Sequence, residues 1–68
     1  MKLSARNVLK GKVVGIARGA VTSHVRLQVG DATVTASITN EAVDELKLRE
    51  GEDAYAVIKA TDVMIGKD

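Results

Sequence analysis

The residues best suited to chemistry in this chain form two short polar clusters, one near each end. Ser4-Ala5-Arg6-Asn7 lies near the start and Lys59-Ala60-Thr61-Asp62 near the end. Each cluster sets a hydroxyl close to a cation and beside a small alanine, which leaves backbone N–H groups unobstructed. Hydrogen bonds from such donors are strongest when the acceptor is ionised. The two clusters therefore predict a site for a small dianion, with Asp62 as the one unfavourable charge.

Thr39 is a third candidate contributor. The residues Thr39-Asn40-Glu41 are typical of a helix start, where a Thr or Asn caps the helix and an acid follows. The first N–H groups of a helix have no partner within it and carry partial positive charge, which suits an anion. The alternative is that Thr39 is a plain N-cap, and the two roles are compatible.

The composition predicts a thin hydrophobic core. The chain has 68 residues, enough for one domain, with no Phe, no Trp and a single Tyr. Domains of this size rarely obtain more than about 3–5 kcal/mol from one core, and they commonly add disulfides, a metal or further subunits. There is no Cys, and His24 is the only imidazole, so we expect neither a disulfide nor a metal bound directly by side chains. Homo-oligomerisation is the remaining source of stability.

Charge and motif content argue against several classes of function. A net charge of +1 lacks the basic excess of a polyanion binder, and one Tyr offers too few stacking platforms for single-stranded nucleic acid. No apolar run approaches the ~20 residues of a membrane span, so we expect a cytoplasmic protein without a membrane partner. The chain has no nucleophile with a base, no paired carboxylates and no phosphate loop, so we do not expect an enzyme.

Three strands are predicted before the helix. Residues 8–16 are rich in β-branched and aliphatic types, with glycines where a bend is tolerated. Residues 21–29 and 33–38 alternate apolar and polar types, and Gly30-Asp31 between them predicts a tight hairpin turn of type II′. The inward-facing positions of the second strand are Val21, Val25, Leu27 and Val29.

A short helix and a last β segment complete the pattern. The helix follows Thr39-Asn40 and ends before Gly51. A strand is predicted over residues 54–59, apolar on both faces and so covered on both sides, with a shorter strand over 62–65. This order predicts a mainly β fold, a small OB-like five-stranded barrel with one short helix, and an SH3-like barrel is the alternative.

Four segments of the chain resemble the molbindins, the Mop-type small molybdate-binding proteins. The resemblance runs through nearly the whole chain in one register. The segments that carry it are Ser4-Ala5-Arg6-Asn7, residues 9–14, residues 38–43 and residues 55–65.

The resemblance implies a single Mop domain over residues 1–68 that assembles as a hexamer, a trimer of dimers. It further implies that molybdate or tungstate is held between subunits for intracellular storage or homeostasis, without an organic cofactor. By motif, the main oxyanion site would combine Ser4, Ala5 and Arg6 of one chain with Thr39, Lys59, Ala60 and Thr61 of a neighbour. A second kind of site near a symmetry axis would be lined by Gly19, Ala20, Val21 and Thr22. Some relatives place a serine where this chain has Ala42, which removes one side-chain donor.

Two other functions stay open at this level: an OB-fold nucleic-acid-binding module and an interaction module without a ligand. Donor chemistry itself favours a fully deprotonated tetrahedral dianion such as molybdate, tungstate or sulfate. Hydrogen phosphate fits less well, because its proton needs an acceptor and the proposed donor residues supply no carboxylate.

Overall fold

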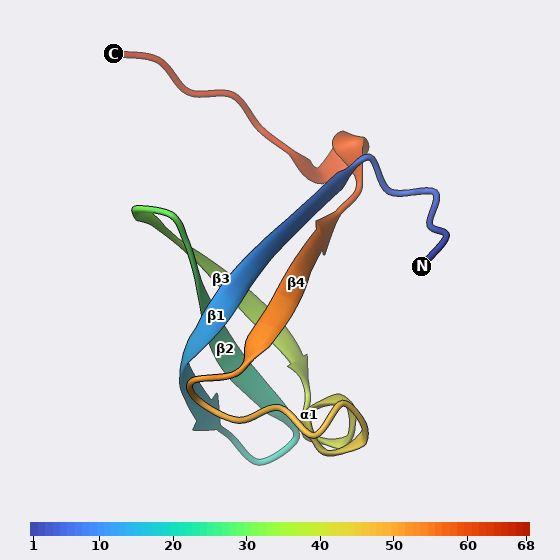
Figure 1. The fold of residues 1–68 in the computed structure, drawn as a ribbon, viewed down its shortest axis with the longest axis vertical. Helices are drawn as coiled ribbons and strands as arrows, with labels where there is room; N and C mark the ends of the chain where they lie inside the picture. The colour runs from blue at the N-terminus through green and yellow to red at the C-terminus, as the bar shows by residue number, and fades with distance from the viewer.

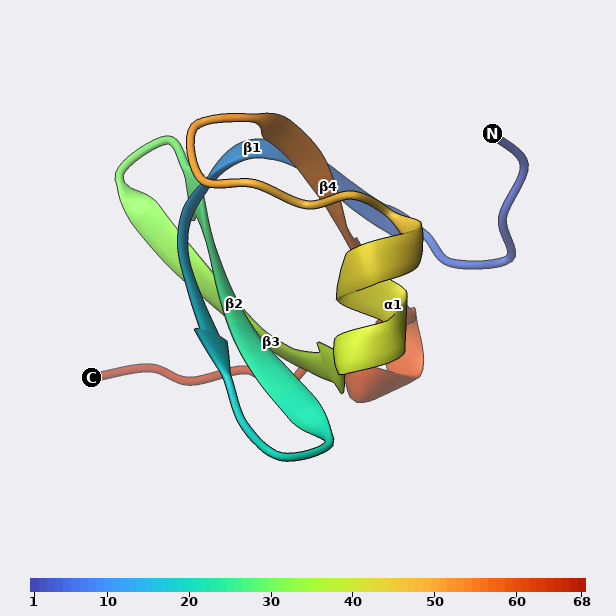
Figure 2. The same ribbon diagram turned by 90° about the horizontal axis from the view of Figure 1, so that it is seen from below.

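In the computed structural model, which describes all residues from 1 to 68, four antiparallel strands form one sheet in the order β3-β2-β1-β4 (Figure 1). The sheet bends around the core, and the single α-helix lies beside one end of it (Figure 2). The elements are β1 (Asn7–Arg18), β2 (Thr22–Val29), β3 (Ala32–Thr39), α1 (Asn40–Glu45), β4 (Asp53–Ile58) and a 3₁₀ turn, η1 (Ala60–Asp62).

The long first strand holds the sheet together. Its first half pairs with β4 and its second half with β2, and the register shifts at a bulge between Val13 and Gly15. A bulge increases the local bend of a strand, which agrees with the predicted curvature. Gly11 permits the close approach of β2, because a Cβ at this position would collide with the Gln28 carbonyl oxygen.

The predicted hairpin between the second and third strands is confirmed. Val29 pairs with Ala32 across the two-residue turn, and Gly30 has a φ of 59°. Asp31, the next residue, has no positive φ. A glycine with positive φ followed by a residue with negative φ is the pattern expected of a type II′ turn.

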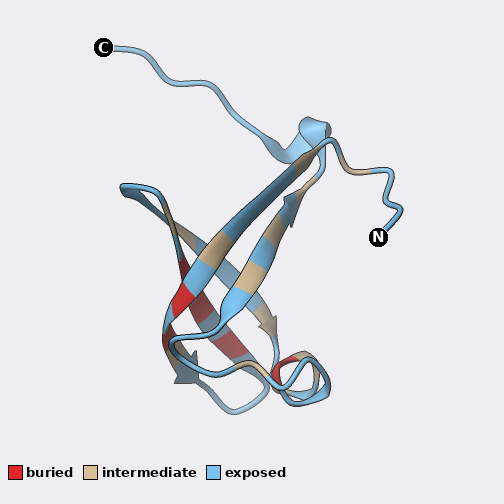
Figure 3. Cartoon of the chain, viewed as in Figure 1, coloured by how far each residue is buried: buried red, intermediate tan, exposed pale blue.

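The core is thin, as the composition predicts. Only 6 of the 68 residues are buried, and the hydrophobic ones among them come from β1, β2 and α1 (Figure 3). The prediction that Val21 faces inward was wrong: Val21 is 71% exposed, because β2 begins one residue later and leaves Val21 in the turn. The inward position near this end belongs to Ser23, which is fully buried. The four core hydrophobics are Val13, Val25, Leu27 and Val43.

The predicted fifth strand is absent, so the chain by itself forms a four-stranded open sheet rather than a closed five-stranded barrel. Residues 60–62 form η1, and residues 63–68, hereafter the tail, belong to no helix or strand and leave the sheet (Figure 1). A strand requires a partner edge, and the tail pairs with neither β3 nor β4, the two edge strands.

The fourth strand is covered on one face only, in contrast to the prediction. Ala54, Ala56 and Ile58 are half-buried, whereas Tyr55 and Val57 are 54% and 45% exposed. Within one chain, no element packs over the face that carries Tyr55 and Val57. That face of β4 is open to solvent in the single chain.

Candidate functional site

The two polar clusters found in the sequence lie at the same end of the sheet. Antiparallel pairing of β1 with β4 sets Asn7 opposite Ile58, so the residues just before β1 and just after β4 are neighbours (Figure 1). The Asn7 side chain strengthens this junction, because its Nδ2 donates to the Ile58 carbonyl oxygen at 3.2 Å. We call this group the terminal cluster; it comprises Ser4, Ala5, Arg6, Lys59, Ala60 and Thr61.

Backbone geometry at η1 leaves donors free. The Asp62 N–H donates to the Lys59 carbonyl at 2.9 Å and the Val63 N–H to the Ala60 carbonyl at 3.3 Å. The N–H groups of Ala60 and Thr61 have no acceptor, and no side chain caps the turn. The terminal cluster therefore presents N–H donors beside its hydroxyls.

The two cations of the terminal cluster are also without carboxylate partners. The ion pairs of the chain join Lys10 and Lys12 to Asp53, Arg18 to Asp44, and Arg49 to Glu52. Arg6 and Lys59 are exposed and take part in none of them. Asp62 is exposed at the end of η1, where its charge opposes an anion.

Thr39 lies away from the terminal cluster. Its side-chain oxygen accepts from the Ala42 N–H at 3.0 Å, which confirms its role as the N-cap of α1. Across the sheet it pairs with Thr22, at the end opposite η1 (Figure 1). Within one chain the last strand runs back along β1, so Thr39 and Lys59 lie at opposite ends of the sheet. Their meeting in one oxyanion site, which the resemblance implies, stays a prediction.

A second group of candidate residues forms at that opposite end. Asn40, the first residue of α1, donates from its N–H to the Val21 carbonyl at 2.8 Å and from Nδ2 to the Gly19 carbonyl at 3.0 Å. Its Oδ1 accepts from the buried Ser23 hydroxyl at 2.5 Å. We call this group the turn cluster; it comprises Gly19, Ala20, Val21, Thr22 and Thr39.

Sequence reasoning missed both Ser23 and Asn40 as supports of the turn. A signal was available, because Ser23 lies at an inward position of a strand whose other inward residues are apolar. A buried hydroxyl needs a hydrogen-bond partner, and Asn40 is the polar residue that the helix start places next to it.

An ion pair ties the helix to the end of β1. Arg18 Nη1 donates to Asp44 Oδ1 at 2.9 Å and Nη2 to Oδ2 at 3.3 Å, a bidentate contact. The hydrogen bond from Arg18 and, to a lesser extent, its charge lower the pKa of Asp44, and the same contact raises the pKa of Arg18.

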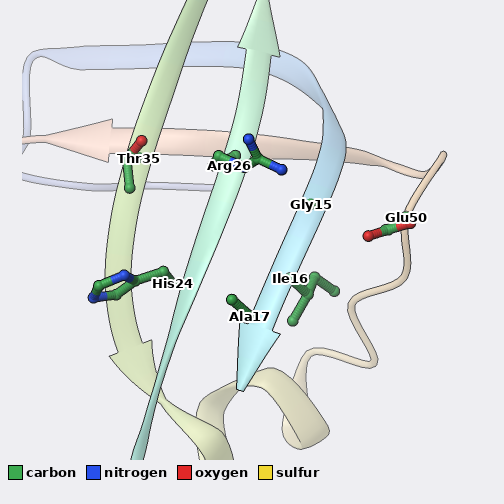
Figure 4. A pocket seen from close by; sticks show the side chains of 7 residues that line it. All are labelled: Gly15, Ile16, Ala17, His24, Arg26, Thr35 and Glu50. Carbon is green, nitrogen blue, oxygen red and sulfur yellow. The ribbon is translucent and has the colours of Figure 1, made fainter. Parts of the chain in front are cut away.

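A shallow hollow of about 280 Å³ lies apart from both clusters, on the sheet around the bulge of β1 (Figure 4). Arg26 and Thr35 line it from adjacent strands, His24 lies beside them, and Glu50 reaches it from the loop before β4. His24 is exposed.

A larger apolar groove of about 430 Å³ lies between the two edges of the sheet. All but one of its 13 lining residues are hydrophobic. They come from β2, β3, β4, the stretch after α1 and the N-terminal Met1. No His, Cys, Asp and Glu side chains cluster in a way that could hold a metal ion, and no helix is long and apolar enough to cross a membrane.

Comparison with known proteins agrees with the fold. The family model described as the TOBE domain matches residues 3–65, nearly the whole described chain. The chain belongs to the TOBE-domain family. Its fold, four antiparallel strands and a short helix, matches that of MopII from Clostridium pasteurianum in a ligand-free form. The TM-score is 0.90 at 48% identity, and the match covers 97% of this chain and all of that one.

Within the family, the chain is similar to molybdenum-binding members. It is 52% identical over 67 residues to a protein of Haemophilus influenzae named "Probable molybdenum-pterin-binding protein", with 97% of each chain covered. It also matches the cytoplasmic molybdate-binding protein ModG in a molybdate-bound form, with a TM-score of 0.84 and 48% identity. That match covers 88% of this chain and 43% of ModG. The molbindin resemblance is thereby confirmed.

Proposed function

We propose that this protein binds molybdate as a free oxyanion at the terminal cluster. The observation that carries the proposal is the pairing of Asn7 with Ile58, which brings two partnerless cations, two hydroxyls and two free backbone N–H groups to one end of the sheet. All of these groups donate and none accepts strongly, which fits a tetrahedral dianion with four acceptor oxygens.

The ligand that we propose is the oxyanion itself rather than a molybdenum-pterin compound. A pterin ring needs a flat apolar or aromatic surface for stacking, and the terminal cluster contains no aromatic side chain. Tungstate has the same charge and nearly the same shape as molybdate, so the same donors accept it. Similarity to ModG, which is described as molybdate-binding, supports this choice.

We propose further that the site is completed by a second copy of the chain. The tail carries Val63, Met64 and Ile65, which are 45%, 92% and 91% exposed, and the sheet has an open apolar groove between its edge strands. The tail of one chain placed in the groove of another would supply the missing fifth strand and bury these side chains. Since the tail begins directly after η1, this docking sets the terminal cluster at a subunit interface.

The assembly that we propose is the hexamer implied by the molbindin resemblance, built as a trimer of dimers. In it, Ser4, Ala5 and Arg6 of one subunit meet Lys59, Ala60 and Thr61 of a neighbour. The role that follows is reversible storage of oxyanion in the cytoplasm, where ModG, a similar protein, is described to act.

Calorimetric titration of the wild-type protein with molybdate tests this function. Arg6→Ala and Lys59→Ala should each weaken binding while the domain stays folded, because each removes a charge-assisted donor from an exposed position. Arg26→Ala is the matched control, since Arg26 is a cation without a carboxylate partner that lies in the hollow, outside the cluster. Equal affinity in all four proteins would contradict the site.

A further inference from the structure

We infer that the hollow beside the bulge of β1 binds hydrogen phosphate, an anion of different chemistry from molybdate. The binding groups are Arg26 and Thr35 as donors and Glu50 as acceptor, and all three residues line the hollow. None of them belongs to the terminal cluster or to the turn cluster. The inference therefore goes beyond the proposed function and does not depend on it.

Gly15 gives the Arg26 side chain its position. The two residues pair across β1 and β2, directly after the register shift of the bulge. Val25 and Leu27, which flank Arg26 in β2, lie in the core, so Arg26 itself faces the opposite side of the sheet. A Cβ at position 15 would lie 2.5 Å from Nη2 and 2.8 Å from Nε of Arg26. The guanidinium therefore rests on the backbone of Gly15, and Gly15 is buried.

The Arg26 guanidinium and the Thr35 hydroxyl are free donors on one face of the sheet. Arg26 pairs with Thr35 across β2 and β3, so the two side chains leave the sheet side by side. Neither takes part in an ion pair or a side-chain hydrogen bond within the chain. A guanidinium binds phosphate oxygens through a planar fork of N–H groups, and the neighbouring hydroxyl adds another donor. This side of the hollow therefore suits a tetrahedral oxyanion.

Glu50 adds a carboxylate acceptor, which no residue of the terminal cluster provides. Its carboxylate points toward β1 from the loop before β4, and the Arg26 guanidinium points toward β1 from the other side (Figure 4). Backbone hydrogen bonds tie this loop to the strand, because the Gly51 N–H donates to the Val13 carbonyl at 2.8 Å and the Val13 N–H to the Glu52 carbonyl at 2.9 Å. Arg26 and Glu50 form no ion pair with each other, so both are free for a ligand.

Donors on one side and an acceptor on the other favour an oxyanion that keeps a proton. Hydrogen phosphate is such an ion: its charged oxygens accept from Arg26 and Thr35, while its P–OH group donates to Glu50. Molybdate and sulfate carry no proton at neutral pH. Either ion would turn an acceptor oxygen toward the Glu50 carboxylate, and the like charges would repel. The hollow should therefore select hydrogen phosphate, and the terminal cluster a fully deprotonated dianion.

Amide and guanidinium NMR of the isotope-labelled full chain tests the inference, in titrations with phosphate and with sulfate at neutral pH and equal ionic strength. Phosphate should shift the Arg26 Nε–H and the amides of Gly15 and Thr35, with half-saturation at roughly millimolar concentration because the groups are exposed. Sulfate should bind the same groups at least about fivefold more weakly. No response to phosphate, or an equal response to the two ions, overturns the inference.

Gly15→Ala is the most specific variant, because it displaces the guanidinium without removing its charge. The colliding atoms are the free end of a flexible side chain, so Arg26 moves and the backbone does not have to. Phosphate binding should weaken at least about fivefold. Gly66→Ala is the matched control, since a Cβ at that position meets nothing within 4 Å, and it should bind phosphate as wild type does. If Gly15→Ala fails to fold, Arg26→Lys replaces it, because it keeps the charge and loses the fork.

Glu50→Gln tests the acceptor. The amide no longer repels an anion, so the preference for phosphate over sulfate should fall to less than about twofold. Glu45→Gln is the matched control, since Glu45 is an exposed acid of α1 that also makes no ion pair. The preference should persist in the control. A Glu50→Gln variant that keeps the full preference contradicts the assigned role of the carboxylate.

The two ligands separate this inference from the proposed function. Gly15→Ala and Glu50→Gln should bind molybdate as wild type does, and Arg6→Ala should bind phosphate as wild type does. Phosphate-induced shifts that disappear in Arg6→Ala would place phosphate at the terminal cluster and overturn the inference alone. Protein that binds phosphate in the hollow and no molybdate at all would support the inference and contradict only the proposed function.

Discussion

The terminal cluster and the turn cluster both present free backbone N–H donors, but they are built in opposite ways. The terminal cluster has free charge and little internal support: Arg6 and Lys59 are exposed, and Asn7 supplies the only side-chain hydrogen bond nearby. The turn cluster has strong internal support, through Asn40 and Ser23, and its local cation is paired. The contrast predicts tight binding that depends on assembly at one end and weak binding that depends on preorganisation at the other.

The largest expected effect comes from removing the tail. Truncation after Asp62 removes three exposed apolar side chains, so the oligomer should dissociate and binding at the terminal cluster should be lost. Size-exclusion chromatography with light scattering measures the first effect and calorimetry the second. Removing only Lys67 and Asp68 is the control, since the apolar residues stay and the assembly should persist. An intact oligomer after the longer truncation would contradict the proposed role of the tail.

Next in size are substitutions of the free arginine. A charge-assisted hydrogen bond contributes about 1.5–3 kcal/mol, so Arg6→Ala should weaken molybdate binding by roughly 10- to 100-fold. Arg6→Lys keeps the charge but loses the planar fork, and its loss should be smaller. Calorimetry over a range of salt concentrations checks both. If the Arg6 substitutions also weakened molybdate binding at the turn cluster, the two clusters would not be independent.

The two asparagines give a direct comparison of structural support. Asn40→Ala alone leaves the buried Ser23 hydroxyl without a partner, which should destabilise the protein by about 1–3 kcal/mol. Asn7→Ala removes the hydrogen bond to the Ile58 carbonyl. The cost should be smaller, because a carbonyl oxygen has a second lone pair with which to accept another hydrogen bond. Urea unfolding should therefore rank Asn40→Ala as the more damaging change, and the reverse order would contradict the contrast in support.

The contact between Arg18 and Asp44 should make the turn end sensitive to acid. The pKa of Asp44 is lower in the folded protein than its ordinary value of about 4, so the contact with Arg18 stabilises the folded state above that pH. This contribution is lost as the pH falls through the folded-state pKa. Asp44→Asn should flatten the fall in thermal midpoint below about pH 4, relative to wild type. If the thermal midpoint of the variant falls with acid as steeply as that of wild type, other carboxylates cause the loss of stability.

The smallest effect is expected from Asp62→Asn. Asp62 is exposed near the proposed ligand, and interactions between exposed charges are commonly worth less than about 1 kcal/mol. The variant should bind molybdate up to about fivefold more tightly at low salt, with the gain disappearing at high salt. A loss of affinity would indicate that the Asp62 carboxylate takes part in the site.

Local features of the fold were predictable from sequence, and features that depend on pairing were not. The Gly30 turn and the Thr39 cap follow from backbone chemistry within a few residues, and both were confirmed. The fifth strand was predicted from apolar residues in the tail, but a strand also needs an edge to pair with, and within one chain the tail has none.

The candidate site shows the same division. The donors of the terminal cluster could be identified from the sequence. Its two halves lie side by side because the first and last strands pair in antiparallel fashion. The position of Thr39 was not readable, because it depends on which end of the bent sheet the helix occupies (Figure 2). Residue type suggested that Thr39 could join an anion site, and topology places Thr39 beside Thr22 of the turn cluster.

Native mass spectrometry of the full chain with and without molybdate tests the central claim most directly, because it reports subunit number and bound ions together. The account predicts a homo-oligomer that retains molybdate, and an Arg6→Ala variant of the same subunit number that retains fewer ions. A spectrum that is identical with and without molybdate, or an Arg6→Ala variant with an unchanged ion count, would contradict it.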